Sequence, residues 1–169
     1  MVTIFKLKLA FIAIGKVAEA MGIKILPFLE LTLQNIKEGL SLKGKLRTNS
    51  EGSIFQCISS LAIAVGPALT KHMHETLDFM FQGGISSALI QALFDLSMHI
   101  PPLANSIRVR LLNLLSMILV GHPYQHPGAP NRVPPSIQPK DGTLVKITVL
   151  YYRLQKQMIF RLLFLHWKH

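Results

Sequence analysis

The sequence predicts an all-α fold, an α-solenoid of about three antiparallel helix pairs followed by a proline-rich linker and a basic tail. Apolar residues recur at helical spacing, Gly or Pro interrupts each apolar stretch, and this helix, corner and helix pattern recurs along the chain. Because each helix has one apolar face to bury, consecutive helices are expected to pack as hairpins. We predict a solenoid over residues 1–120, with pairs at 7–38, 53–84 and 86–120.

The central pair, residues 53–84, shows the pattern most clearly. Ser53 is placed to cap its first helix, Gly66 to end it, and Pro67 to open the second helix, where a first-turn proline loses no hydrogen bond. Gly83 and Gly84 stop the second helix. The apolar stripes of the two helices are Ile54, Phe55, Ile58, Leu61, Ala62 and Val65, and then Leu69, Met73, Leu77 and Met80.

The same pattern recurs on both sides of the central pair. A shift of 35 positions forward places its apolar residues on Leu89, Ile90, Leu93, Leu96, Ile100, Leu112 and Leu115. A shift of 44 positions back places them on Phe11, Ile14, Ala18, Met21, Leu29, Leu33 and Ile36. The corner residues Gly66 and Pro67 fall on Gly22 and Pro102. Both shifts lie at or just below the period of about 40–47 residues that two-helix solenoid repeats show.

In the first pair we expect helices over residues 7–21 and 25–38, the second with its inward stripe at Leu26, Leu29, Leu33 and Ile36. Residues 39–52 are predicted to form a long connector. Its three basic residues, Lys43, Lys45 and Arg47, are interpreted as a solvated loop, with contact to phosphate or to an acidic partner as the alternative.

In the third pair, Ser86 and Ser87 are candidate caps, and Pro101 and Pro102 form the corner. The second helix is expected over residues 103–120, with Arg108 and Arg110 away from its buried stripe. That stripe is Ile107, Leu111, Leu114, Leu115 and Ile118.

The composition is apolar and basic. Apolar residues make up 50% of the chain and charged residues 15%, against about 25% in a typical soluble domain. Residues 52–70 carry no charge, but Gly66 and Pro67 leave a continuous apolar helix of about a dozen residues, typical of a buried core helix and too short for a span. The N-terminal apolar run is interrupted by Lys16, so we favour a helix over a signal peptide there. The single cysteine, Cys57, excludes a disulfide framework and fits a reducing compartment.

The C-terminal third differs from the repeats. Residues 121–142 hold six of the ten prolines and are predicted to form an extended linker. Residues 103–169 hold nine Lys or Arg against one Asp or Glu, a net charge of +8, whereas residues 1–102 have a net charge of +2. In the basic aromatic tail, residues 143–169, the run LVKITVLYY has strand character and the run that follows has helix character. The tail suits a membrane surface or an anionic strand, or it begins another helix pair.

No arrangement of catalytic, cofactor-binding or metal-binding residues is predicted. The chain has no Gly-rich phosphate loop and no kinase catalytic or metal-binding loop. His72 and His74 are two residues apart and would point to different faces of a helix, and His122 and His126 have no neighbouring ligand. The carboxylates Glu75, Asp78 and Asp95 occupy expected helix surface positions and are interpreted as solvated. We therefore expect no enzyme, no cofactor and no small-molecule substrate.

Several segments together resemble the N-terminal HEAT-repeat region of the target of rapamycin (TOR) serine/threonine kinases. They are LAFIAIG (residues 9–15), FQCISSLAIAVGPAL (55–69), LFDLSMHIPPL (93–103), LLNLLSMILVGHP (111–123) and HPGAP (126–130), and their order and spacing match over roughly residues 7–130. The more specific features are Cys57-Ile58, Gly66-Pro67, Asp95-Leu96-Ser97 and Pro127-Gly128. The likeness fades after residue 142.

The resemblance implies a HEAT-like scaffold segment of a large kinase of the PI3K-related family, whose catalytic domain is not in this chain. It further implies protein partners, either a Raptor-type regulatory subunit or the rest of a TOR solenoid, and a cytoplasmic location with association at endomembrane surfaces. The alternative is a small cationic membrane-surface protein that acts through residues 143–169. Nucleic-acid binding, which the basic charge also suits, is a third and less favoured reading.

Overall fold

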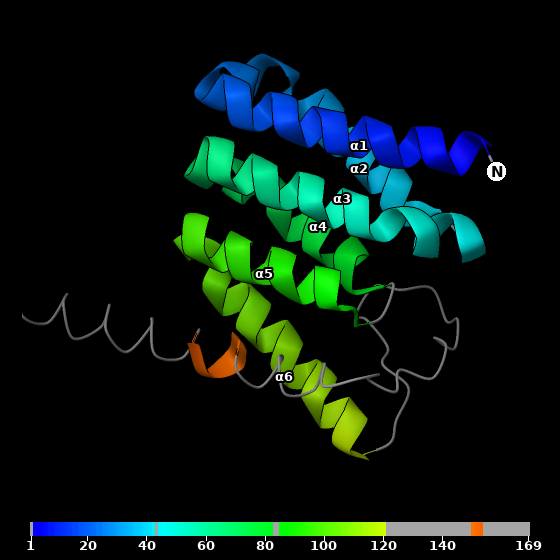
Figure 1. The fold of residues 1–169 in the computed structure, drawn as a ribbon. Coiled ribbons are helices and arrows are strands. Elements are labelled where there is room, and N and C mark those ends of the chain that lie inside the picture. Colours follow the sequence, from blue (N-terminus) through cyan, green and yellow to red (C-terminus); the bar gives the residue numbers. More distant parts are fainter. Residues whose placement is uncertain (1, 43, 83–84, 121–149, 154–169) are drawn as a thin grey trace, which may run out of the picture.

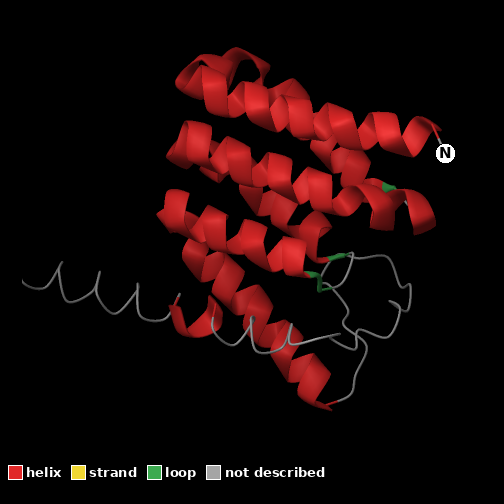
Figure 2. Ribbon diagram, viewed as in Figure 1, coloured by secondary structure: helices red, strands yellow, loops and turns green. Residues whose placement is uncertain are grey.

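The computed structural model describes residues 2–42, 44–82, 85–120 and 150–153. Within these residues the chain is helical throughout, apart from short connections, and contains no strand (Figure 2). The all-α prediction is confirmed. The elements are α1 (Val2–Met21), η1 (Gly22–Phe28), α2 (Leu29–Ser41), α3 (Gly44–Val65), η2 (Gly66–Leu69), α4 (Thr70–Phe81), α5 (Ser87–His99), η3 (Pro101–Leu103) and α6 (Ala104–Val120).

The helices stack as three pairs in two layers. Figure 1 shows α1, α3 and α5 side by side and running in the same direction, with α2 and α4 behind them. The contacts agree, since α1 packs on α3, α3 on α5 and α2 on α4. The three corners η1, η2 and η3 lie at the same end of the helices, at the left of the view (Figure 1). This arrangement is a solenoid of stacked helix pairs, as the recurring pattern predicts.

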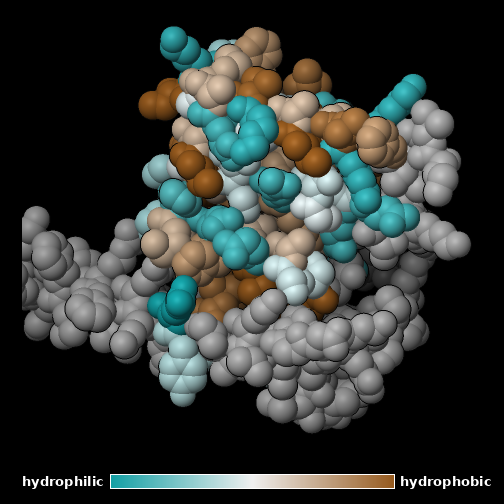
Figure 3. Space-filling model, in the orientation of Figure 1, coloured by the Kyte–Doolittle hydropathy of each residue, from teal (hydrophilic) through white to brown (hydrophobic). Residues whose placement is uncertain are grey.

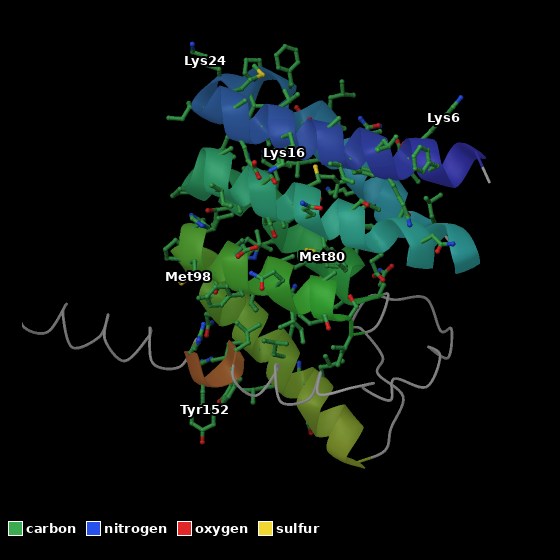
Figure 4. The ribbon with its side chains drawn as sticks, in the orientation of Figure 1. Lys6, Lys16, Lys24, Met80, Met98 and Tyr152 are labelled. Carbon is green, nitrogen blue, oxygen red and sulfur yellow. The ribbon has the colours of Figure 1, made fainter. Side chains whose placement is uncertain are left out.

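The predicted stripes form one continuous core. In the central pair every stripe residue is buried, and Leu69, Met73, Leu77 and Met80 have no exposed surface. Met80 lies inside the stack in Figure 4. The buried residues of the flanking pairs that the stripes predict are Phe11, Ala18, Leu29, Leu33, Ile36, Leu89, Ile90, Leu93, Leu96, Ile100, Ile107, Leu111 and Leu114. Leu112, which the repeat matches to buried Leu77, is instead 41% exposed.

Two glycines allow the corners to turn tightly. Gly22 has φ +54° and Gly66 has φ +49°, in the left-handed region where a side chain is strained. Pro67 follows Gly66 in the first turn of η2, where its missing N–H has no partner to lose. At the third corner Pro101 opens η3, and Ser86 caps α5 by accepting a hydrogen bond of 3.2 Å from the Leu89 amide. The cap predicted at Ser86 is confirmed.

The predicted connector over residues 39–52 is wrong. Helix α2 continues to Ser41 and α3 already begins at Gly44, so Ser53 lies inside a helix and caps nothing. The connector was predicted because Gly, Ser and Asn favour turns locally. In the structure, however, Ser50 is fully buried and lies in a helix that packs along α1. Tertiary contacts therefore override the local preference.

Two smaller expectations are also corrected. Leu26 is 40% exposed, and Ile25 is buried in its place, because residues 22–28 form a 3-10 helix around Pro27 and the α-helical register begins only at Leu29. Residues 150–153 are helical, so the strand character of LVKITVLYY does not give a strand at its end. The predicted linker, the rest of the tail, Gly83, Gly84 and the side chains of Leu115 and Ile118 lie outside what the structure describes.

By length and composition alone, the stretch Asn49–Phe81 is long and apolar enough to cross a membrane. In the structure it is divided at Gly66, where the chain reverses between α3 and α4. Both halves bury their apolar faces against neighbouring helices, which is the behaviour of core helices in a helical stack.

Candidate interaction surface

Large apolar side chains are exposed mainly on the first helix pair. Eight of them belong to α1, η1 and α2, and we call this set the outer face of the first pair. They are Phe5, Leu9, Ile12, Val17, Ile23, Leu26, Phe28 and Leu31, with exposed fractions between 37% and 72%. Figure 3 shows apolar groups, with polar groups between them, over the upper part of the molecule where these elements lie. Exposed apolar groups gathered on one part of a surface indicate a contact site.

The outer face is bordered by lysines. Lys6 and Lys24 point away from the stack at its outer edge in Figure 4, and both are exposed. Lys16 is also exposed, and its Nζ lies 2.7 Å from Oε2 of Glu19. A surface with an apolar centre and a basic border favours a partner with an apolar stripe and acidic flanks.

The contact between α1 and α3 shows how first helices stack in this protein. Gly15 of α1 lies against α3 so closely that an added Cβ would be 3.2 Å from Ser60 Oγ and 3.4 Å from Cys57 Cα. Beside it, Ser60 donates a hydrogen bond of 2.6 Å to Glu19 Oε1. Hydrogen bonds from Lys16 and Ser60 lower the pKa of Glu19 below 4.5. The two helices thus meet through small residues and one charged hydrogen bond.

The repeat places an equivalent surface on the outside of α1. Shifting back 44 positions takes Cys57 to Ala13 and Leu61 to Val17. Cys57 and Leu61 are buried in α3, whereas Ala13 and Val17 are exposed on α1. Ala13 and Val17 are therefore small and apolar like Cys57 and Leu61, but they are exposed on α1, whereas their counterparts are covered in α3.

Charged residues join the second helices of the pairs. Lys37 Nζ of α2 lies 2.6 Å from Glu75 Oε2 of α4, and this hydrogen bond lowers the pKa of Glu75. Three residues further along α4, Asp78 accepts hydrogen bonds from Arg110 of α6. The interpretation of Asp78 as simply solvated is therefore wrong, and Glu75, although 75% exposed in its side chain, is paired as well.

Comparison with known proteins finds relatives among large kinases. The chain is 39% identical over 114 residues to the serine/threonine-protein kinase TOR2 of Saccharomyces cerevisiae, which covers 67% of the chain. It is 38% identical over 117 residues, 69% of the chain, to tor1 of Schizosaccharomyces pombe, and 34% identical over 110 residues, 64% of the chain, to TOR of Oryza sativa. The chain is homologous to a segment of the TOR kinases.

The match spans about 5% of the length of the two yeast TOR kinases and 4% of the rice protein. No family model matches the chain. The resemblance to TOR kinases read from the segments between residues 9 and 130 is confirmed.

In the described part of this TOR-like segment, the polar residues considered for chemistry do not converge; His122 and His126 lie outside it. Among the described residues no group of three or more His, Cys, Asp and Glu could hold a metal ion. His74 Nδ1 lies 3.4 Å from Ser106 Oγ of α6, and Asp95 accepts a hydrogen bond from Gln91 within α5. Burial raises the pKa of the Cys57 thiol to about 12, so it is protonated and unreactive at neutral pH.

The outer face was not among the features predicted from the sequence of this TOR homologue. A signal for it exists, because Phe5, Leu9 and Ile12 are spaced by four and three residues and form a second stripe on α1. This stripe is separate from the one that faces the core, in which Phe11 and Ala18 are buried and Ile14 is partly buried.

Proposed function

We propose that this chain is a non-catalytic helical-repeat scaffold segment that mediates protein–protein contacts in a TOR complex. The homology to TOR kinases supports the setting. The observation that carries the proposal is the outer face of the first pair, where eight large apolar side chains are exposed on the helix pair at one end of the stack.

The occupant we assign to this face is a neighbouring helix pair of a TOR solenoid. The equivalence of Ala13 and Val17 to buried Cys57 and Leu61 supports it, because the interface between α1 and α3 would then be repeated on the other side of α1. The lysine border supports acidic residues flanking the apolar stripe of the neighbour. Burial of eight large apolar side chains would provide much of the binding energy.

Two further parts of the proposal concern the setting. A Raptor-type regulatory subunit is the other protein partner that the resemblance implies. It would compete with the neighbouring helix pair for the outer face, or bind beside it. The protein is proposed to act in the cytoplasm, where a single buried thiol such as Cys57 stays reduced.

The test uses the residues of S. cerevisiae TOR2 that directly precede the segment matched by this chain, expressed as a separate polypeptide. Titration calorimetry would measure its binding to the full chain and to the double variant Ile12→Glu with Leu31→Glu. Because both side chains are exposed, the variant is expected to fold, which circular dichroism verifies. The control is Ile63→Glu, which changes an exposed isoleucine of α3.

We expect binding by the full chain and by the control, and loss of at least about tenfold in affinity for the double variant. Absence of binding by the full chain, or equal effects of the control and the double variant, would contradict the proposed occupant. If a Raptor-type subunit binds the outer face and the TOR2 polypeptide does not, the scaffold role is supported and the assigned partner is wrong.

A further inference from the structure

A short helical turn from the C-terminal region packs against the third pair. Leu150 is only 3% exposed and belongs to the same core cluster as the three helix pairs. The guanidinium carbon of Arg153 lies 5.3 Å from the centre of the Phe94 ring in α5, a cation–π contact. Because Leu150 and Arg153 are three residues apart in a helix, both lie on one side of the turn.

The other side of the turn faces solvent. Tyr152 is 68% exposed and points away from the stack in Figure 4. Its ring meets that of Tyr151 edge to face, with centroids 6.4 Å apart. The turn therefore has Leu150 and Arg153 on the side against the protein and the Tyr152 ring on the side toward solvent, as a capping element of a repeat protein requires.

The position of the turn continues the order of the first helices. In Figure 1 residues 150–153 lie on the side of α5 away from α3, so that the sequence of layers is α1, α3, α5 and then this turn. The repeat agrees, since Phe94 corresponds to Ser59 by the shift of 35 residues, and Ser59 is 9% exposed within the middle layer. Phe94 thus occupies a position whose equivalent in the middle pair is almost fully covered.

We propose that residues 150–153 form an intramolecular cap, which takes the place of the first helix of a following pair. The two ends of the stack then differ. The first pair exposes eight large apolar side chains, whereas α5 and α6 expose Met98, Val109 and Leu112 among the residues described. Residues 150–153 would then occupy the place of a following first helix beside α5, whereas the outer face of the first pair stays open to a helical neighbour. This inference is independent of which neighbour the outer face binds.

A cross-linking experiment tests the proximity while the buried anchor Leu150 stays in place. The full chain with Phe94→Cys and Arg153→Cys is treated with a short bismaleimide, and the intramolecular product is identified by peptide mass analysis. Cys57 does not compete, because its thiol is fully buried. The matched control pairs Lys24→Cys with Arg153→Cys, which joins the cap to the opposite end of the stack.

Rapid cross-linking of the first pair of cysteines, abolished in denaturant and absent from the control, is expected. Equal cross-linking of both pairs, or none in the folded protein, would overturn the cap. Neither result depends on binding at the outer face, so this experiment can disprove the cap without disproving the proposed scaffold contact.

Hydrogen exchange gives a second readout on the full chain. Replacing Leu150 by Ala removes the buried anchor, so amides of α5 (Ser87–His99) are expected to exchange at least about tenfold faster. Tyr152→Ala, which alters an exposed ring on the same turn, should leave α5 unchanged. If Leu150→Ala leaves the exchange of α5 unaltered, or both variants accelerate it equally, residues 150–153 are not a cap.

Discussion

Arg110 of α6 donates two hydrogen bonds to the same oxygen, Oδ1 of Asp78 in α4, from Nε at 2.9 Å and from Nη2 at 2.5 Å. The guanidinium also donates to the Ser106 carbonyl through Nη1 at 3.2 Å. This pair ties the third helix pair to the second, as Lys37 and Glu75 tie the second to the first. Charged contacts therefore follow the second helices from one pair to the next.

The Asp78 to Arg110 pair is expected to contribute measurable coupling. A double-mutant cycle with Asp78→Asn and Arg110→Met, followed by urea unfolding, should give about 1 kcal/mol, because both side chains are partly buried and two hydrogen bonds are made. The Lys37 to Glu75 pair, with Glu75 75% exposed, should give a smaller value. Coupling that is larger for the exposed pair would contradict this reading of the two contacts.

Gly66 should not tolerate a side chain. Gly66→Ala forces a residue with a Cβ to adopt φ +49° and brings it 3.4 Å from the His99 carbonyl, so a loss of about 1–2 kcal/mol in unfolding free energy is expected. Gly52→Ala is the control, since Gly52 lies inside α3 with open space around it and alanine should add about 0.5–1 kcal/mol. Equal effects of the two changes would show that the corner is not constrained as described.

Gly39 marks a close approach in the first pair. A Cβ at this position would lie 2.9 Å from Ile54 Cδ1 and from Phe11 Cζ, both of which are buried side chains. Gly39→Val is therefore expected to destabilise the protein by about 1–3 kcal/mol through overpacking, as measured by chemical denaturation. The companion variant with Phe11→Leu should recover part of the loss, and failure to do so would place the strain elsewhere.

The charged hydrogen bond between α1 and α3 predicts a pH dependence. The pKa of Glu19 is lower in the folded protein than its ordinary 4.5, so the carboxylate contributes stability above that value. This contribution is lost as the pH falls through the folded pKa. Urea unfolding from pH 7 downward should show a smaller decline below pH 4.5 for Glu19→Gln than for the parent, and parallel declines would contradict the prediction.

The Cys57 thiol should report global unfolding. It is fully buried and its pKa is raised to about 12, so a maleimide should label the native protein only when it opens. Labelling rates are expected to rise with urea in step with unfolding measured by circular dichroism. Fast labelling in native buffer would show that α3 is accessible where the structure has it covered by α1.

The buried stripes could be predicted because helical spacing reports directly which face of a helix is covered. Phe55, Leu61 and Leu93, for example, are all buried as their spacing indicates. The helical residues 44–52 could not be predicted in this way, since their Gly, Ser and Asn favour turns and only the packing of α3 along α1 makes them helical. The prediction that Leu26 faces inward was also wrong, because residues 22–28 form a 3-10 helix that contains Pro27, and α-helical spacing does not apply there.

Spacing shows that α1 has a second apolar stripe, but it does not show which apolar face stays exposed or which charged residues pair between the helix pairs. Arg110, the partner of Asp78, is 32 residues away in sequence. The pair can be predicted only if it is known that α4 and α6 are neighbours in space. The exposure of Leu9 and Ile12 likewise depends on which side of α1 has a neighbour. Sequence gives the amphipathic faces, and the stacking decides which of them remain open.

Hydrogen exchange of the full chain, alone and mixed with the polypeptide that precedes the matched segment in S. cerevisiae TOR2, tests the central claim most directly. The account predicts that protection increases in α1 (Val2–Met21) and α2 (Leu29–Ser41), the helices that carry the outer face, while α5 and α6 are unchanged. Protection confined to α5 and α6, or no change in any helix, would contradict a scaffold that extends from its first helix pair.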